Sequence, residues 1–332
     1  IASLFNSNVK IHYLPFNKSA KGLIQYIINL NHLKILIKNI NPNIIHAHNS
    51  SVSYLYLALA IYLSNIKCKN IRTIHFAGFF LEKKTIIDKI RFYLDKLGSK
   101  ITGTVIIGVS PLVTKIVKSL YNSNKSITIC NGVDCEKKFN PNNKHSLPSV
   151  MNKEKHSDLN IIYVARLSEG KGHKILLCAW RELIKKYDNI HLFLIGDGPL
   201  ANELNCFIKN QNLGNKITFV GSVSNVSDYL KYSDIAVFPS VSEGLGLVLL
   251  EKMAMKLPIV ASSIPIFQFL IRNNKTGVLF NPFDCNDLAH KIEMLICNNS
   301  LREEIGINAR EFVINNFSID KMIEKHNYIY RT

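Results

Sequence analysis

Several features that would assign this chain of 332 residues to a well-known class are absent. It contains no Asp-x-Asp pair, no Walker loop, no Gly-x-Ser-x-Gly elbow and no histidine pair with metalloprotease spacing. Its seven cysteines form neither a Cys-x-x-Cys pair nor a Cys/His cluster. We therefore expect no structural zinc, no disulfide framework and a reducing compartment. The most apolar stretch, 52–63, is too short to span a bilayer.

Acidic residues are scarce in the first half of the chain. Residues 1–150 hold 20 Lys and Arg against 5 Asp and Glu, whereas residues 151–332 hold 21 against 19. Compositional drift would have enriched both halves in basic residues, so we favour a charged surface that meets anionic lipid, nucleic acid or a phosphorylated substrate. No nucleic-acid recognition motif or aromatic–basic platform accompanies it, so a nucleic-acid-binding module is the less favoured alternative.

Apolar runs typical of strands alternate with helical patterns along the whole chain, which indicates α/β architecture with parallel sheets. We predict two Rossmann-like domains that face each other across a cleft. The predicted organisation is a first domain at 1–140, a linker at 141–157, a second domain at 158–316, and a C-terminal helix at 317–332 that returns toward the first domain. The predicted strands are 9–14, 44–48, 71–75, 105–109 and 127–130, then 161–165, 191–195, 217–220, 235–238, 259–261 and 277–280.

The run at 239–251 is the most informative in the chain, because two carboxylates, Glu243 and Glu251, stand eight residues apart in it. A helix that starts near Gly246 would present unpaired N–H groups and a positive dipole end, which together bind anions. Gly244 and Gly246 would let the backbone approach a phosphate closely. The run therefore predicts an anion cradle beside two acceptors for hydroxyl groups.

Two cations follow the predicted strand 161–165 directly. Arg166 and Lys171 would lie at its carboxyl end, where ligands bind in open α/β sheets. The loop that carries Glu243 follows strand 235–238 in the same way, so both loops can face one point. We expect Arg166 and Lys171 to neutralise a diphosphate there and to replace a divalent metal ion.

Histidines end two strands of the first half. His75 closes strand 71–75 and is expected to hydrogen-bond a sugar hydroxyl, whereas packing and loop hydrogen bonds are favoured for His46 and His48. The segment 81–100 mixes apolar and basic residues at helical spacing. This pattern fits either a helix that lies on anionic headgroups or an ordinary core-facing helix with a charged back.

Taken in order, the motifs resemble those of retaining glycosyltransferases with the GT-B fold and the E-x7-E signature, of the family 4 or group 1 type. The resemblance covers nearly the whole chain. The matching stretches are 45–48 (Ile-His-Ala-His), 73–75 (Thr-Ile-His), 107–110 (Ile-Gly-Val-Ser), 131–134 (Asn-Gly-Val-Asp), 164–167 (Val-Ala-Arg-Leu), 171–172 (Lys-Gly), 196–199 (Gly-Asp-Gly-Pro), 239–251 and 276–277 (Thr-Gly).

The resemblance implies roles for matching positions. Arg166 and Lys171 would hold the donor diphosphate, together with the backbone N–H groups near Gly246 and Leu247.

Three further roles concern the sugar. Glu251 would bind the donor ribose, Glu243 a hydroxyl of the transferred sugar, and His75 the sugar or the acceptor side of the cleft.

The chain departs from the family pattern in three places. The family's opening strand, glycine-rich loop and helix are absent, so we expect an N-terminally incomplete chain that is itself inactive in transfer. Lys256 stands where the family usually has glycine, and Phe269 where a glutamate is common.

The implied function is transfer of a sugar, with retention, from a nucleotide-sugar donor to a saccharide or lipid-linked acceptor in surface polysaccharide or lipopolysaccharide assembly. Neither a metal nor a nucleic-acid partner is expected. The enzyme would be cytoplasmic and peripheral on the inner face of the plasma membrane, which its basic first domain would contact. A sugar-nucleotide epimerase on the same fold is the main alternative.

Overall fold

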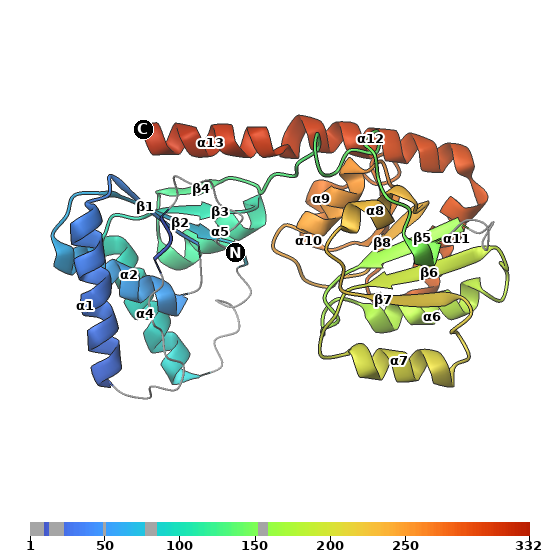
Figure 1. Ribbon diagram of the computed structural model, residues 1–332, viewed down its shortest axis with the longest axis horizontal. Coiled ribbons are helices and arrows are strands. Elements are labelled where there is room, and N and C mark those ends of the chain that lie inside the picture. Colours follow the sequence, from blue (N-terminus) through green and yellow to red (C-terminus); the bar gives the residue numbers. More distant parts are fainter. Residues whose placement is uncertain (1–9, 13–22, 49–50, 77–84, 152–158) are drawn as a thin grey trace. The chain divides into compact units, whose positions relative to one another are not determined.

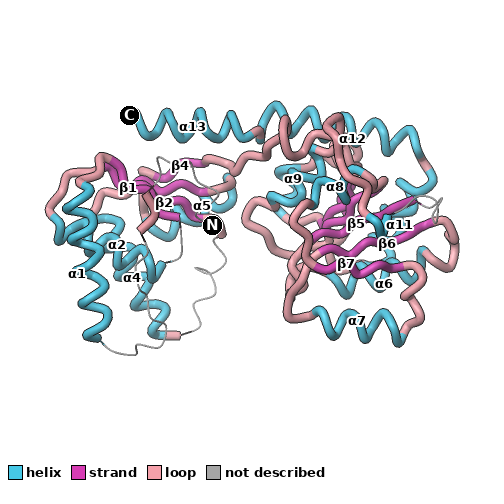
Figure 2. Tube along the Cα trace, viewed as in Figure 1, coloured by secondary structure: helices cyan, strands magenta, loops and turns pink. Residues whose placement is uncertain are grey.

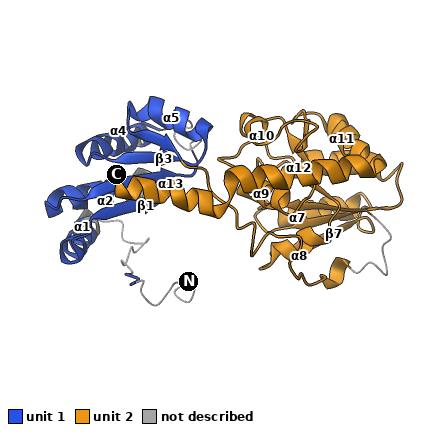
Figure 3. Cartoon of the chain, turned by 90° about the horizontal axis from the view of Figure 1, so that it is seen from above, with its two compact units in different colours: residues 1–128 blue, residues 129–332 orange. Residues whose placement is uncertain are grey.

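The computed structural model describes residues 10–12, 23–48, 51–76, 85–151 and 159–332. The chain divides into two compact units, residues 1–128 (unit 1) and residues 129–332 (unit 2), which are coloured separately in Figure 3. Within the described residues, no helix is both long and apolar enough to cross a membrane.

Unit 1 contains a four-stranded parallel sheet in the order β1-β2-β3-β4. Helix α1 packs against α2, and α2 packs against α4, while α5 contacts β3 and β4 (Figure 1). The elements of unit 1 are α1 (Leu23–Ile40), β1 (Ile44–His48), α2 (Ser51–Ser64), β2 (Lys69–Ile74), α4 (Ile86–Ile101), β3 (Val105–Gly108), α5 (Pro111–Tyr121) and β4 (Ser126–Thr128).

Local sequence explains where two of these helices begin. The Ser110 side chain accepts a hydrogen bond from Val113 N, and Pro111 occupies the first turn of α5, where its missing N–H is not needed. Thr85 and Asp88 form a reciprocal capping box at the start of α4. Both helices therefore start at positions that their own residues specify.

Unit 2 contains a six-stranded parallel sheet in the order β10-β9-β8-β5-β6-β7 (Figure 2). Helix α6 packs against α11, and α9 packs against α12. The strands are β5 (Leu159–Val164), β6 (Ile190–Ile195), β7 (Ile217–Gly221), β8 (Ile235–Phe238), β9 (Ile259–Ser262) and β10 (Val278–Phe280). The α-helices are α6 (His173–Leu183), α7 (Ala201–Asn210), α8 (Val226–Lys231), α9 (Leu247–Ala254), α10 (Pro265–Leu270), α11 (Cys285–Cys297), α12 (Asn299–Phe317) and α13 (Ile319–Arg331).

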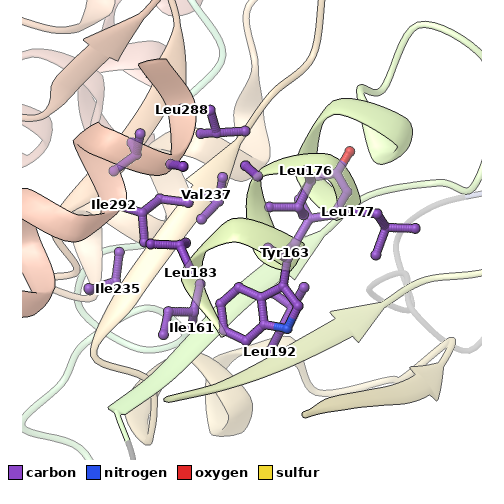
Figure 4. Close-up of a cluster of buried hydrophobic side chains, with 14 of the residues drawn as sticks. Ile161, Tyr163, Leu176, Leu177, Leu183, Leu192, Ile235, Val237, Leu288 and Ile292 are labelled. Atoms are coloured by element: carbon purple, nitrogen blue, oxygen red, sulfur yellow. The ribbon is translucent and has the colours of Figure 1, made fainter. Parts of the chain in front are cut away.

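The core of unit 2 lies between the sheet and the helices α6 and α11. Ile161 and Leu192 from neighbouring strands meet Leu176 of α6 and Ile292 of α11 in one buried cluster (Figure 4). Trp180, the single tryptophan, is fully buried in the same cluster. Strands that are buried on both faces read as continuous apolar runs, which is why their positions could be predicted from the sequence.

The predicted α/β class with two parallel sheets is confirmed, and the strands agree with prediction to within two residues at each end. The exception is the predicted strand 9–14. Residues 10–12 form no strand, and the rest of it lies outside the described residues. The predicted domain limits, and a return of the last helix toward the first domain, stay predictions.

The cysteines correct one expectation. Cys178 of α6 and Cys285 of α11 form a disulfide, with their Cα atoms 5.9 Å apart, so the expectation of no disulfide framework does not hold for this pair. The two residues are 107 positions apart in the sequence and meet because α6 packs against α11. The other five cysteines are free.

Candidate functional site

Two loops of unit 2 leave the sheet at the point where its strand order reverses. The chain continues from β5 to β6 and β7 on one side, whereas β8, β9 and β10 lie on the other, and β5 pairs directly with β8. The loop from β5 to α6 (residues 165–172) and the loop from β8 to α9 (residues 239–246) therefore start at neighbouring carboxyl ends. In open parallel sheets, ligands bind at such a switch point.

The two loops touch each other. Val241 N donates a hydrogen bond to Gly170 O at 2.9 Å. Gly172 has φ 75°, and a Cβ added to it would lie 2.0 Å from Pro239 O. The left-handed backbone and the close approach both require glycine here, which explains one of the motif residues physically. The prediction that the loops converge is confirmed by these contacts.

The convergence pairs one predicted cation with one predicted carboxylate. Lys171 Nζ lies 2.6 Å from Glu243 Oε1, and both side chains are largely buried. Beneath this pair, Tyr163 donates a hydrogen bond to Lys171 O, and His173 begins α6. Burial, together with the Lys171 charge, lowers the pKa of His173 to about 4, so this histidine is neutral near pH 7.

Arg166 differs from Lys171 in its surroundings. It is exposed, and although its carbonyl accepts a hydrogen bond from Ser168 N, its guanidinium makes no hydrogen bond or ion pair with the residues that the structure describes. Its guanidinium is thus available to an anion that reaches the loop, whereas Lys171 would have to exchange Glu243 for such an anion.

Helix α9 begins where the sequence predicts. Gly246 is its N-cap with φ 79° in the left-handed region, and an added Cβ would lie 2.9 Å from the Phe267 ring. Leu247 opens the helix, with its side chain partly exposed. No side chain caps the first turn, so the backbone N–H groups near Gly246 and Leu247 can meet an anion.

Glu251 lies just over one turn into α9 and is partly buried. Burial raises the pKa of its carboxyl, while the charges of Lys138 and Lys252 oppose the rise. A carboxyl in this setting accepts hydrogen bonds from hydroxyl groups that enter the site, which fits the expected ribose contact.

The sequence interpretation missed Lys252, which follows Glu251. Lys252 is fully buried, its Nζ donates to Val237 O at 3.1 Å, and the ammonium lies 4.5 Å from the centre of the Phe238 ring. Burial lowers the pKa of Lys252 to about 7, against the opposing effects of Glu251 and Glu243. A lysine within an otherwise apolar helical run was the signal that could have revealed it.

In unit 1, His75 follows β2 and lies beside His48 at the end of β1. His48 Nδ1 and His75 Nε2 are 3.2 Å apart, and partial burial together with His48 lowers the pKa of His75. His46 Nε2 meets Thr73 Oγ1 at 2.8 Å, which agrees with its expected structural role. His48 instead contacts the candidate histidine itself. Residues 77–79, which follow His75, lie outside the described residues.

Among the residues that the structure describes, no three His, Cys, Asp or Glu side chains are grouped as metal ligands.

The two units, each with a parallel sheet and flanking helices, define an α/β enzyme of the GT-B class. Comparison with known proteins gives the same result. Residues 150–312 match the family model for glycosyl transferases group 1, and residues 3–137 match the model for glycosyltransferase family 4.

Curated relatives extend these matches. The chain is 26% identical over 337 residues to the Escherichia coli UDP-Gal:alpha-D-GlcNAc-diphosphoundecaprenol alpha-1,3-galactosyltransferase, covering 99% of this chain and 86% of the relative. It is 30% identical over 249 residues to the Staphylococcus aureus capsular polysaccharide biosynthesis glycosyltransferase CapM, covering 72% and 64%.

A solved structure of a glycosyltransferase is also similar to this chain. The glycosyltransferase from Rickettsia africae superposes with a TM-score of 0.79 at 26% identity, covering 95% of this chain and 83% of that chain. The chain belongs to glycosyltransferase family 4, the group 1 glycosyltransferases.

Proposed function

We propose that this glycosyltransferase moves a sugar from a nucleotide-sugar donor to its acceptor with retention of anomeric configuration, and that the donor binds at the β5–β8 switch point of unit 2. One observation carries the proposal. The loop that carries Arg166 and Lys171 touches the loop that carries Glu243 and leads into α9, through the Lys171–Glu243 pair and the hydrogen bond from Val241 N to Gly170 O. Positive charge and free N–H groups suit a diphosphate, and the carboxylates suit hydroxyls.

The Lys171–Glu243 pair suggests how donor binding would prepare the site. A diphosphate competes with Glu243 for the Lys171 ammonium, and its greater charge favours the exchange. Glu243, released from Lys171, then accepts a hydrogen bond from a hydroxyl of the transferred sugar. Glu251 accepts from the ribose, and His75 contacts the sugar or the acceptor. Each residue thus keeps the role that the family resemblance implies.

The chemical step breaks the bond between the anomeric carbon and the leaving diphosphate oxygen and forms a bond from that carbon to the acceptor oxygen on the same face. The acceptor hydroxyl gives its proton to the departing diphosphate. Arg166, Lys171 and the α9 N–H groups stabilise the charge that develops on the leaving group, so the residues present can perform this step without a metal ion.

The donor and acceptor are proposed by similarity. The E. coli relative uses UDP-Gal and a diphosphoundecaprenol-linked sugar, and the S. aureus relative takes part in capsular polysaccharide biosynthesis. We propose a UDP-sugar donor, a lipid-linked saccharide acceptor, and a role in surface polysaccharide assembly at the cytoplasmic face of the membrane.

The test is calorimetric titration with UDP, followed by transfer assays on the same variants of the full-length enzyme. Arg166→Ala or Lys171→Ala is expected to lower turnover at least about a hundredfold, the scale of losing one positioned electrostatic contact. Lys174→Ala is the matched control. Lys174 follows Lys171 by three residues, but it is exposed and paired with Glu203. Activity of the first two variants within a few-fold of wild type would refute the assignment.

The same assays distinguish the proposed roles of Glu251 and Glu243. Glu251→Ala is expected to weaken UDP binding chiefly, whereas Glu243→Ala is expected to leave UDP binding nearly intact and to weaken discrimination between donor sugars. The reverse pattern would exchange their roles.

A further inference from the structure

Helix α4 of unit 1 turns its apolar side away from the unit. Its sequence fitted either a membrane-surface helix or a core-facing helix with a charged back, and the burial of its side chains separates these interpretations. The inward face carries Asp95, which is fully buried, and Ser99, which is nearly so. An ordinary amphipathic helix would have placed its isoleucines and leucines there.

The inward face is held by polar and close-packed contacts. Arg72 Nη1 donates to both Asp95 carboxylate oxygens, at 2.9 and 3.1 Å, and Tyr121 donates to the same carboxylate. A Cβ added to Gly98 would lie 3.1 Å from Ala58 Cβ of α2, so the two helices approach closely. Removing one partner of such a buried pair is strongly destabilising, so this orientation of α4 is strongly specified.

The opposite face of α4 is a row of large apolar side chains, here called the α4 stripe. Each is 41 to 74% exposed, and the periodicity of a helix places them within an arc roughly 100° wide. Together they expose about 600 Å², the upper end of the range for the largest apolar patch on a typical soluble monomer, and such a patch is often functional. The α4 stripe consists of Ile86, Ile90, Tyr93, Leu94, Leu97 and Ile101.

Basic residues border the α4 stripe on both sides. Helical spacing puts Lys89, Lys96 and Lys100 along one border and Arg91 on the other. Residues 1–128 as a whole hold 17 Lys and Arg against 3 Asp and Glu. Asp95, one of the three acidic residues, forms a buried ion pair with Arg72. Two other basic residues of the segment, Lys83 and Lys84, lie outside the described residues.

We propose that the α4 stripe is a docking surface for a membrane that contains anionic lipid. Its apolar residues would enter the boundary between headgroups and acyl chains while the bordering lysines meet headgroup phosphates. Charge decides between this occupant and a second copy of the chain, since two copies would bring like-charged borders together. The inference deepens the proposed function, because a lipid-linked acceptor is met at a membrane surface.

Vesicle co-sedimentation of the full chain tests the stripe. Phosphatidylcholine vesicles are compared with vesicles that contain phosphatidylglycerol at about a third of the lipid. Ile90→Ser with Leu97→Ser is expected to weaken partitioning onto anionic vesicles at least about tenfold, because each side chain loses its apolar burial. The control is Ile28→Ser with Ile35→Ser on α1, which removes similarly exposed apolar residues.

Two triple variants test the basic residues that border the α4 stripe. Lys89→Gln, Arg91→Gln and Lys100→Gln together are expected to abolish the preference for anionic vesicles and to flatten the salt dependence of binding. Lys115→Gln, Lys118→Gln and Lys125→Gln remove the same charge from exposed positions elsewhere in unit 1 and are expected to retain most of the binding.

Tyr93→Trp adds a direct probe of insertion, because Trp180 is buried in unit 2 and its emission is not expected to respond to vesicles. The emission of the variant should move to shorter wavelength on anionic vesicles. Equal binding to both vesicle types, or binding that the stripe variants do not weaken, would overturn the proposal. So would a concentration-dependent dimer, seen by analytical ultracentrifugation, that the stripe variants dissociate.

UDP titration of the same variants keeps this proposal separate from the donor site. Variants that lose vesicle binding are expected to bind UDP as the unmodified chain does. Normal vesicle docking without UDP binding would refute the proposed donor site and leave the docking surface standing, whereas the opposite result would refute only the docking surface.

Discussion

Replacing Lys252 by methionine is expected to stabilise unit 2 at neutral and acidic pH. The ammonium is fully buried with one hydrogen bond, to Val237 O, and burial lowers its pKa from 10.5 to about 7. At 1.36 kcal/mol per pKa unit, holding the charged form in the fold costs about 5 kcal/mol as an upper bound. Methionine has similar length and no charge, so Lys252→Met should raise the free energy of unfolding by about 1–4 kcal/mol near pH 6.

The sign of the pH dependence follows from the two pKa values of Lys252. Below pH 7 the side chain is protonated in both the folded and the unfolded chain, so the cost of burial is complete and constant. Between pH 7 and about 10.5 the unfolded chain holds more protons than the folded chain, so stability rises with pH. The advantage of Lys252→Met should therefore shrink by about 2–3 kcal/mol between pH 7 and 9.

Urea unfolding followed by Trp180 emission at several pH values measures this difference, because Trp180 lies in the core of unit 2. Lys252→Arg should be less stable than wild type at every pH, since a guanidinium does not lose its proton in this range. Lys174→Met, at an exposed lysine, should show no pH-dependent difference. A constant difference in unfolding free energy between Lys252→Met and wild type from pH 6 to 9, or a less stable methionine variant at pH 6, would show that burial of the Lys252 charge does not destabilise unit 2.

Three further predictions concern the backbone and the metal. Lys256→Gly should raise the free energy of unfolding by about 1 kcal/mol in urea titrations, because Lys256 adopts a left-handed φ of 60° that a β-carbon disfavours. A loss of stability would show that contacts of the Lys256 side chain contribute more to stability than the backbone strain costs. Gly172→Ala should weaken UDP binding and lower the free energy of unfolding by at least about 1 kcal/mol, since the added Cβ would collide with Pro239 O. Unchanged UDP affinity would show that the contact between the two loops is not needed for donor binding. Excess EDTA should leave the transfer rate unchanged if Arg166 and Lys171 stabilise the leaving diphosphate as proposed, and loss of activity restored by magnesium would contradict this.

Much of unit 2 could be predicted because its sheet is buried on both faces, and such strands read as apolar runs between turn residues. The start of α9 followed from Gly246, and the convergence of the two loops followed from the rule for parallel sheets. These features depend on local pattern and on topology, both of which a single sequence carries.

Features that depend on long-range packing could not be predicted in the same way. Periodicity showed that α4 is amphipathic but not which side faces inward, which is decided by the pair of Arg72 with Asp95. The disulfide of Cys178 with Cys285 depends on how α6 meets α11. Lys252 is buried because its side chain reaches Val237 and Phe238 of β8, and the sequence around Lys252 does not show that the Val237 carbonyl accepts its hydrogen bond.

Proton NMR of the reaction products distinguishes sugar transfer with retention from inversion and from epimerisation of the donor. The full-length enzyme is incubated with a UDP-sugar, with and without a lipid-linked saccharide acceptor. We expect free UDP and a product with the donor's anomeric configuration, formed only when acceptor is present and lost in Arg166→Ala but not in Lys174→Ala. A product of inverted configuration would contradict the retaining mechanism, and an isomerised UDP-sugar formed without acceptor would identify an epimerase instead.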